Sequence, residues 1–303
     1  MQSKLNTAIE HVAEVLLGKT EVIRLATCCL LSGGHLLLED LPGVGKTTLA
    51  HALAKVFGLD FSRVQFTSDL LPADIIGLSL FDKNTHEFEF RRGPVFTQLL
   101  LADEINRATP KTQSALLEAM AEYQVSNDGK TYALPEPFFV VATQNPERHG
   151  GTFALPESQL DRFSMRLSIG YPSIEAERRI LNGQGQAMSS LQACLSAEEL
   201  AASIKLVKAV RVETVCMDYI QRLIQRSRNH PDISLGLSPR AAITLVNSAK
   251  SWAYLDGRDF VRASDVQAVF GAVAAHRMRG AADSVAPDNR LATLLLDTTD
   301  VVV

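Results

Sequence analysis

The stretch HLLLEDLPGVGKTTLAHALAKVFG, residues 35–58, joins an apolar run to a glycine-containing turn and then to a helical pattern. Gly43 and Gly45 allow the backbone to curl so that its amides point inward at a phosphate. The helix that follows presents its positive N-terminus to the same anion. In such a loop Lys46 reaches the β- and γ-phosphates of a nucleotide, and Thr47 ligates magnesium. The stretch therefore predicts a phosphate-binding loop between a buried strand and a helix.

One position departs from the full GxxxxGK[ST] pattern, because Asp40 stands where the first glycine is expected. The departure removes one conformationally free residue and places an acid beside an anionic ligand, unless the side chain points away. We include Val44 and Thr48 among the predicted nucleotide-binding residues of the loop. The alternative is an ordinary turn at a strand–helix junction.

A second motif, QLLLADE at residues 98–104, places two acids at the end of an apolar run. If the run is a strand beside the phosphate loop, Asp103 holds magnesium through water and Glu104 polarises the attacking water. Taken alone, the pattern is common, and the two acids could be charges at a helix N-terminus. Together with the phosphate loop it predicts ATP hydrolysis.

Two regions with different patterns predict two domains. Residues 1–172 alternate helical patterns with four apolar runs that end in polar residues: 35–40, 61–66, 98–104 and 138–146. Such runs are typical of buried parallel strands in a layered α/β domain, whose carboxyl edge binds ligands. Residues 173–282 show helical periodicity and no convincing strand, which predicts an all-helical second domain. The tail, residues 283–303, is either a docked segment or a mobile end.

Cap residues locate several of the helices. Residues 1–16 have the pattern of an amphipathic helix rather than that of a signal peptide. Ser196 and Glu199 form a capping-box signature, and Ser238 precedes a helix that begins with a proline. Ser264 is a candidate cap for a further helix.

Composition narrows the class of protein. The 303 residues carry a net charge of −4, which argues against a dominant basic surface for nucleic acid. No apolar run approaches the roughly 18 residues that cross a bilayer. The four cysteines lack CxxC spacing, and we expect reduced, buried thiols in a cytoplasmic protein. They are Cys28, Cys29, Cys194 and Cys216.

Five ordered motifs together resemble the MoxR family of AAA+ ATPases over about residues 15–282. They are the phosphate loop, LLLADEINRA (99–108), ATQNP (142–146), LPESQLDRF (155–163) and GLSPRA (236–241). The resemblance implies an α/β fold: an αβα P-loop sandwich with a five-stranded parallel sheet, followed by a smaller all-helical lid. It also implies ATP and Mg²⁺ as ligands and assembly into a homo-oligomeric ring, usually a hexamer.

Three site residues follow from the resemblance. Asn145 matches the sensor-1 position, where its amide orients the attacking water; the alternative is a turn residue before a proline. Arg162 matches the arginine finger, which acts on the neighbouring subunit's nucleotide; the alternative is a salt bridge to Asp161 or Glu157. Arg240 matches sensor 2, which contacts phosphate in its own subunit; the alternative is a solvated arginine in a first helical turn.

Two further positions have weaker matches. Gly18, with Lys19, matches the family segment just before the first core strand, which packs around the adenine; a plain turn glycine is the alternative. Arg107 lies where the family has a polar residue at the subunit interface, and a surface arginine is equally consistent with the sequence.

Two insertions resemble those of the family subgroup with a helix-2 insert and a pre-sensor-1 hairpin. Residues 75–96 read as a hairpin turning at DKNT, and residues 122–137 read as a hairpin turning at Asp128–Gly129. In related ATPases such loops project toward the pore or the substrate, and a decorative surface hairpin is the alternative. We expect no conspicuous exposed aromatic pair at either tip.

These observations favour an ATP-hydrolysing ring motor of MoxR type that remodels or activates a partner protein. The resemblance implies a partner with a von Willebrand factor A domain, or a role in metal-cofactor insertion. The alternatives are a nucleic-acid motor or clamp-loader-like ATPase, a nucleotide-gated scaffold that does not hydrolyse ATP, and the motor subunit of a metal chelatase.

Overall fold

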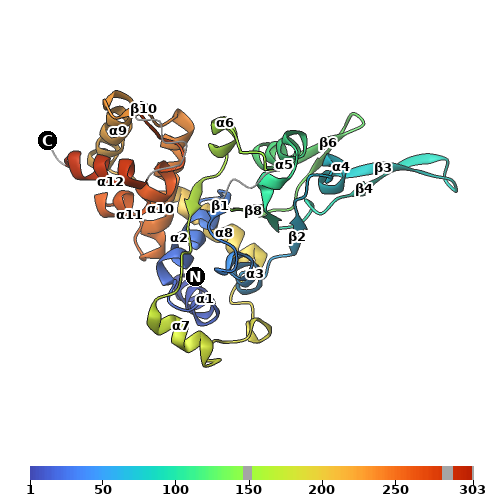
Figure 1. The fold of residues 1–303 in the computed structure, drawn as a ribbon, viewed down its shortest axis with the longest axis horizontal. Helices are drawn as coiled ribbons and strands as arrows, with labels where there is room; N and C mark the ends of the chain where they lie inside the picture. Colours follow the sequence, from blue (N-terminus) through green and yellow to red (C-terminus); the bar gives the residue numbers. More distant parts are fainter. Residues whose placement is uncertain (146–151, 282–288, 302–303) are drawn as a thin grey trace.

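A five-stranded parallel sheet lies at the centre of the computed structural model, which describes residues 1–145, 152–281 and 289–301 (Figure 1). Its strands are, in spatial order, β2 (Phe61–Gln65), β5 (Leu99–Asp103), β8 (Phe139–Gln144), β1 (Leu36–Glu39) and β9 (Met165–Leu167). All neighbours are paired in parallel. The four predicted strands are confirmed, and β9 supplies the fifth. Their carboxyl ends therefore share one edge, as the apolar runs with polar ends predict.

Side chains alternate along the strands and divide the core into two clusters. Leu36 and Leu38 belong to a first cluster that includes residues of the first three helices along the chain, α1 (Gln2–Val15), α2 (Thr20–Leu31) and α3 (Lys46–Val56). Leu37 belongs to a second cluster with α5 (Pro110–Glu122). Leu101 and Leu100 of β5 divide in the same way. This alternation is the period of two that strand geometry imposes. Burying each such leucine contributes roughly 1.5–3 kcal/mol to folding.

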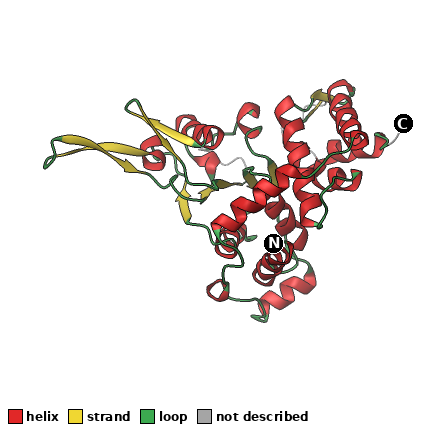
Figure 2. Cartoon of the chain, turned by 180° about the vertical axis from the view of Figure 1, so that it is seen from behind, coloured by secondary structure: helices red, strands yellow, loops and turns green. Residues whose placement is uncertain are grey.

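Helices cover both faces of the sheet and form the second region (Figure 2). They are α1 (Gln2–Val15), α2 (Thr20–Leu31), α3 (Lys46–Val56), α4 (Pro72–Ile76), α5 (Pro110–Glu122), α6 (Glu157–Leu160), α7 (Ile174–Leu181), α8 (Ala197–Ala209), α9 (Thr214–Asn229), α10 (Pro239–Leu255), α11 (Ala263–Ala274) and α12 (Asn289–Thr298). The first of them confirms the predicted N-terminal helix. None of the helices in the described ranges is long and apolar enough to cross a membrane.

Two antiparallel hairpins project from the same side of the molecule (Figure 2). They are β3 (Gly77–Asp82) with β4 (Glu87–Arg92), and β6 (Gln124–Asn127) with β7 (Lys130–Ala133). Asp128 and Gly129 have φ values of 49° and 74°, as a primed turn requires. Both hairpin predictions are confirmed.

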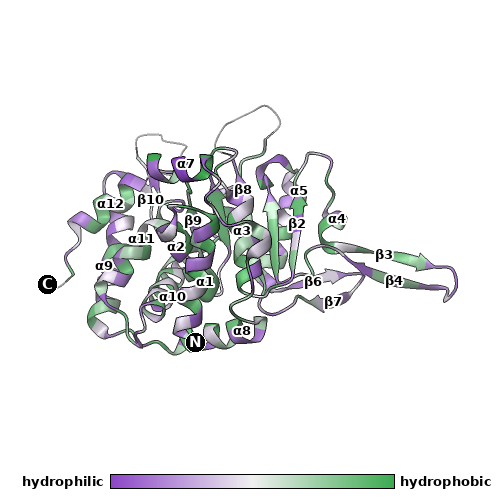
Figure 3. Cartoon of the chain, turned by 90° about the horizontal axis from the view of Figure 1, so that it is seen from below, coloured by the Kyte–Doolittle hydropathy of each residue, from purple (hydrophilic) through white to green (hydrophobic). Residues whose placement is uncertain are grey.

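The β3–β4 hairpin carries an exposed aromatic pair, so the expectation that neither insertion has one is wrong. Phe81 and Phe88 face each other across the strands with ring centroids 5.4 Å apart, and they are 50% and 71% exposed. Nearer the sheet, the same hairpin is covered, because Phe90 stacks on Tyr132 of β7. Figure 3 shows the β3–β4 hairpin extending away from the rest of the chain. The aromatic pair therefore lies beyond the part that the second hairpin covers.

Helix caps in the second region follow the sequence in two places and depart from it in a third. Ser196 and Glu199 form the predicted capping box of α8, and the Ser238 hydroxyl accepts the N–H of Ala241 in α10. In α11, however, the Asp265 carboxylate accepts the N–H of Arg262 at 2.7 Å. The predicted cap at Ser264 is therefore wrong, because the acid one residue later reaches the preceding backbone.

In the part of the second region that the structure describes, the helices are accompanied by one short strand pair and one isolated bridge between Arg211 and Phe260. β10 (Ile233–Leu235) pairs with β11 (Arg279–Gly280) in antiparallel orientation, which corrects the expectation of no strand there. In the tail, α12 packs against α9 and α11, which favours the docked alternative. Residues 283–288 and 302–303 of the predicted tail lie outside the described residues. The domain boundaries after residues 172 and 282 stay predictions.

The four cysteines are free, as expected. Cys28, Cys29 and Cys216 are buried, whereas Cys194 is only half-buried, which corrects the expectation for that residue. Burial raises the pKa of Cys28 to about 12, which leaves the thiol protonated and unreactive.

Candidate active site

The loop between β1 and α3 is shaped by two glycines at the carboxyl edge of the sheet. Gly43 and Gly45 have φ values of 82° and 105°, in the region that glycine enters without strain. A Cβ atom at Gly45 would lie 2.7 Å from the terminal methyl group of Leu16, so a larger residue would also require that side chain to move. α3 begins directly after Gly45, which places its first unpaired N–H groups at the loop. The local geometry therefore fits an anion.

Lys46, the first residue of α3, is buried against the loop. Its ammonium donates to the backbone carbonyls of Asp40 and Leu41 and, at 2.7 Å, to Oδ1 of Asn145. Removal from water lowers the pKa of Lys46, although nearby carboxylates oppose that shift. Three further predicted nucleotide-binding residues are half-buried in and after the loop: Val44, Thr47 and Thr48.

The side chain of Asp40, the unusual residue of the loop, is held by the segment that follows β9. Its carboxylate accepts the N–H of Gly170 at 2.6 Å and the hydroxyl of Ser168 at 2.8 Å. Burial alone would raise the pKa of Asp40, but these hydrogen bonds outweigh it and the pKa is lowered. The Asp40 carboxylate thus takes its hydrogen bonds from the segment after β9, and these bonds anchor the phosphate loop to that segment.

We expect Asp40→Asn to lower the free energy of unfolding at pH 7 by about 1–2 kcal/mol, because the hydrogen bonds then have a neutral acceptor. A depressed native pKa stabilises the fold above the unfolded-state pKa and loses that contribution as pH falls through the native value. The difference from wild type should therefore shrink as the pH is lowered below about 4. Urea unfolding across pH measures it, with the exposed Asp218→Asn as control. An equal difference at every pH would contradict this role.

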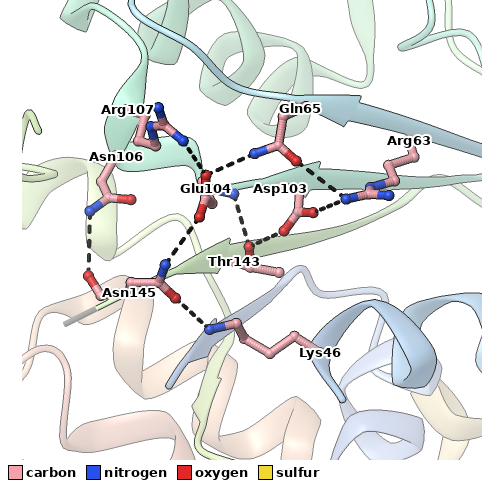
Figure 4. Close-up of polar contacts among 9 residues, drawn as sticks. All are labelled: Lys46, Arg63, Gln65, Asp103, Glu104, Asn106, Arg107, Thr143 and Asn145. Carbon is pink, nitrogen blue, oxygen red and sulfur yellow. Dashed lines mark hydrogen bonds and ion pairs between the residues drawn. The ribbon is translucent and has the colours of Figure 1, made fainter. Parts of the chain in front are cut away.

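The two acids of the second motif lie at the end of β5, and their side chains are held by different partners (Figure 4). The Asp103 carboxylate accepts the hydroxyl of Thr143 at 2.6 Å and pairs with the Arg63 guanidinium at 2.6 Å. Arg63 comes from β2 and Thr143 from β8, the strands on either side of β5. Asp103 is therefore fixed from both sides within the sheet edge.

Glu104 adopts a left-handed backbone conformation, with φ of 57°, and its side chain has three partners. One carboxylate oxygen accepts the Gln65 amide at 2.9 Å and the Arg107 guanidinium at 2.8 Å. The other accepts the amide of Asn145 at 3.1 Å. Non-glycine residues with positive φ often occur at functional sites, where the surrounding structure holds them in place.

Asn145 joins the two halves of the site. Its Nδ2 donates to Glu104 and its Oδ1 accepts from Lys46, so one side chain bridges the phosphate loop and the acids (Figure 4). The structure therefore brings together four predicted residues at the sheet edge: Lys46, Asp103, Glu104 and Asn145. Pro146, the last residue of the ATQNP motif, lies outside the described residues.

The two predicted arginines lie on other segments. Arg162, in the turn between α6 and β9, donates to the carbonyl of Leu117 at 2.7 Å. Its predicted alternative is not observed, since Asp161 pairs with Arg277 and Glu157 pairs with Arg279. Arg240 is exposed in the first turn of α10.

The segment predicted to pack around a base touches the phosphate loop but is placed differently from the expectation. All of α2 separates Gly18 from β1, so Gly18 does not directly precede the first core strand. Its φ is 74°, and a Cβ atom there would lie 3.0 Å from Ala176 of α7. The neighbouring Lys19 donates to the carbonyl of Tyr171 at 2.7 Å. Contact with a base stays a prediction.

Sequence reasoning missed three partners of the acids: Arg63, Gln65 and Thr143. Arg63 and Gln65 are two apart in β2 and therefore lie on one face of the strand. Two polar residues on one face of a strand in the sheet could have indicated that this face meets the acids of the neighbouring strand. Arg107, left open between the interface and the surface, pairs with Glu104.

Two family models match parts of the chain. Residues 35–165 match the model described as the ATPase family associated with various cellular activities, abbreviated AAA. Residues 225–293 match the AAA lid domain. The first match includes the phosphate loop, the two acids, Asn145 and Arg162, and the second includes Arg240.

Similar proteins extend over nearly the whole chain. YeaC of Bacillus subtilis is 46% identical over 276 residues, which are 90% of this chain and 86% of YeaC. The chaperone MoxR1 of Mycobacterium tuberculosis is 39% identical over 297 residues, which are 94% of this chain and 79% of MoxR1. A crystal structure of a candidate ATPase from Cytophaga hutchinsonii has a TM-score of 0.88 at 34% identity, covering 99% of this chain and 95% of that one.

Proposed function

Because the chain belongs to the MoxR family of AAA ATPases, we propose that it binds and hydrolyses ATP between the subunits of a ring and uses this to act on a partner protein. The hydrogen-bond chain Lys46–Asn145–Glu104 carries the proposal, because it joins a phosphate-binding cation to a carboxylate base. ATP turnover with Mg²⁺, measured across protein concentration, tests it. A rate per subunit that rises steeply with concentration is expected, and no hydrolysis at any concentration would contradict it.

The phosphate loop would bind the nucleotide's phosphates through its backbone and Lys46. The backbone of the glycine-containing loop and the N-terminus of α3 would supply N–H donors and a positive dipole. To reach a phosphate, the Lys46 ammonium exchanges its hydrogen bonds with Asp40, Leu41 and Asn145 for phosphate oxygens. Those three acceptors keep the buried cation satisfied before nucleotide binds.

Thr47 and Asp103 fit a magnesium site, because hydroxyl and carboxylate oxygens are the ligands that Mg²⁺ prefers. When bound, Mg²⁺ would neutralise charge on the phosphate oxygens. Thr143 orients one oxygen of Asp103, while the other oxygen is paired with the Arg63 guanidinium. Mg²⁺ would therefore share the Asp103 carboxylate with Arg63 or displace that guanidinium.

Glu104 would act as the base that polarises the attacking water, and Asn145 would orient that water. In the structure both oxygens of Glu104 are engaged, by Gln65, Arg107 and Asn145. The carboxylate must exchange at least one of these partners for water before it acts as a base. Gln65 and Arg107 would therefore restrain Glu104 until the site is loaded.

Arg162 and Arg240 would complete the site from outside the cluster. We propose that Arg162 acts on the nucleotide of the neighbouring subunit, as the family resemblance implies. In its own subunit Arg162 lies on a separate turn, and its guanidinium bonds to the carbonyl of Leu117 rather than to Lys46 or Glu104. Arg240 would contact phosphate in its own subunit, since it is exposed at the start of a lid helix. A hexamer is the proposed assembly.

The partner would be a protein, because the relative MoxR1 is named a chaperone and the β3–β4 hairpin displays Phe81 and Phe88. Exposed aromatic pairs are common anchors at protein interfaces. A partner with a von Willebrand factor A domain, or a role in metal-cofactor insertion, is the finer proposal from the family resemblance. The cytoplasm is the proposed location.

We expect the double substitution Phe81→Ser and Phe88→Ser to leave basal ATP turnover unchanged and to abolish stimulation by an unfolded polypeptide, β-casein. The rings lie on the free part of a hairpin, away from the site, and loss of two aromatic anchors weakens an interface about tenfold or more. Casein titrations of the turnover rate measure this. Val215→Ser, which removes an exposed apolar side chain from α9, is the control. Equal stimulation of both variants, or none of the wild type, would contradict the role of the pair.

A further inference from the structure

The turn that carries Arg162 is held by a buried arginine from the turn that follows α11. Arg277 is 3% exposed, and its guanidinium pairs with the Asp161 carboxylate at 2.6 Å. It also donates to the carbonyl of Phe163 at 2.7 Å and to that of Ser164 at 3.1 Å. The lid thus holds the backbone on both sides of Arg162.

Asp161 also receives a hydrogen bond from the N-cap residue of a lid helix, α10. The Ser238 hydroxyl donates to the second Asp161 oxygen at 2.9 Å while it accepts the N–H of Ala241 as the cap of α10. Arg240 follows two residues later in that helix. One carboxylate therefore connects the cap of the helix carrying Arg240, the lid residue Arg277 and the turn carrying Arg162.

This connection fixes the backbone on either side of Arg162 but leaves the Arg162 side chain free to change its position. Breaking a buried pair such as Asp161–Arg277 leaves a charge without a partner, which is strongly unfavourable. The Arg162 guanidinium, by contrast, is held by a neutral hydrogen bond to Leu117, which contributes about 1 kcal/mol. The turn and the lid helices therefore move together, whereas the guanidinium can leave its place.

We propose that Asp161 is a positioning residue that couples the lid to Arg162, so that the lid orientation sensed by Arg240 in one subunit sets where Arg162 meets the next subunit. The inference rests on the proposed action of Arg162 between subunits. Nucleotide state would pass from one site to the next through Ser238, Asp161 and the backbone of Arg162.

Ser238→Gly tests the coupling with little damage to the helix, because glycine is nearly as good a cap but lacks the hydroxyl that binds Asp161. We expect kcat to fall about fivefold or more and KM for ATP to stay within about twofold. Ser238→Thr keeps the hydroxyl and should restore kcat. Ser196→Gly is the matched control, since that serine caps α8 and bonds Glu198 and Glu199 instead.

Mixed rings locate the defect. A Glu104→Gln subunit lacks the base but can donate its Arg162, whereas an Arg162→Ala subunit keeps its own base and needs a neighbour's arginine. Equal mixtures of these two variants should regain turnover if sites are shared. In a mixture with Glu104→Gln, the Ser238→Gly subunits receive a well-placed Arg162 from their neighbours, so turnover per active subunit should rise. In a mixture with Arg162→Ala, neither variant supplies a well-placed arginine, so turnover should not rise.

Three results would each overturn the coupling. The first is an unchanged kcat in Ser238→Gly, and the second is an equal loss of kcat in Ser196→Gly. The third is a gain of turnover when Ser238→Gly is mixed with Arg162→Ala, because that gain would place the defect of Ser238→Gly in its own subunit's site. If Glu104→Gln and Arg162→Ala do not complement each other, the shared site itself fails and the coupling fails with it. Asp161→Asn removes the charge that pairs with Arg277. If thermal unfolding shows that this variant is folded, we expect the same results in mixed rings and a larger loss of kcat than in Ser238→Gly.

Discussion

Replacing Arg162 with alanine is expected to lower ATP turnover by about a thousandfold or more while ATP still binds. A guanidinium donated by a neighbouring subunit stabilises charge on the transferring phosphoryl group, and such arginines contribute factors of that size. The loss to the fold is small, because the side chain gives up one hydrogen bond to the carbonyl of Leu117. Steady-state turnover and the Kd of a fluorescent ATP analogue, measured on the same preparation, separate the two effects.

Two controls sharpen this result. Arg162→Lys keeps the charge but loses the planar fork, so it should recover only a small part of the rate. Arg211→Ala removes an exposed arginine that pairs with Asp259 and should leave turnover unchanged. A rate that does not depend on protein concentration and survives Arg162→Ala would remove Arg162 as an arginine acting between subunits.

Glu104→Gln is expected to lower turnover by about a hundredfold to ten-thousandfold and to leave ATP binding intact. Glutamine has the same shape, and its single oxygen can still accept the hydrogen bonds from Gln65 and Arg107. Its NH2 group cannot accept from Asn145, and the amide cannot take a proton from water. The phosphate loop and Lys46 are untouched. Single-turnover hydrolysis and the rise in thermal unfolding temperature with ATP measure chemistry and binding separately.

Glu118→Gln, an exposed substitution on α5, is the matched control for the lost charge. If Glu104→Gln hydrolyses ATP at the wild-type rate, Glu104 is not the base. If wild type and variant are equally inactive while both bind ATP, the chain is a nucleotide-gated scaffold rather than a hydrolase.

Features that depend on near neighbours along the chain were predictable from the sequence. The capping box of Ser196 and Glu199 and the Asp128–Gly129 turn need only a few adjacent residues. The strands β1, β2, β5 and β8 are apolar runs with polar ends. β9 spans only Met165–Leu167, too short for a pattern, and its place at the sheet edge comes from pairing with β1.

Features that depend on distant partners were not predictable. β10 and β11 are three and two residues long, and they pair across more than forty residues of chain. The exposure of Phe81 and Phe88 depends on how far the second hairpin reaches along the first, which alternation alone does not reveal.

In the candidate site, too, the features that depend on local sequence were predictable and those that depend on distant partners were not. Lys46, Asp103 and Glu104 follow from motif chemistry, since their residue types and strand–loop–helix context are local. The side chain of Asp40 required the structure, because its partners lie about 130 residues away at Ser168 and Gly170. Arg63 was missed because its partner belongs to the adjacent strand rather than to a nearby residue.

The two hydrophobic clusters divide the molecule differently from its sequence patterns. The first cluster runs without a break from one face of the sheet, through Leu36 and Leu38, to the lid helices and Leu295 of α12. The lid has no separate core in the described residues, so it and that face of the sheet form one cooperative unit of stability. The second cluster is built on the opposite faces of the same strands, through Leu37 and Leu100. The strands therefore join the two clusters, and the junction near residue 172 does not separate two independent hydrophobic cores.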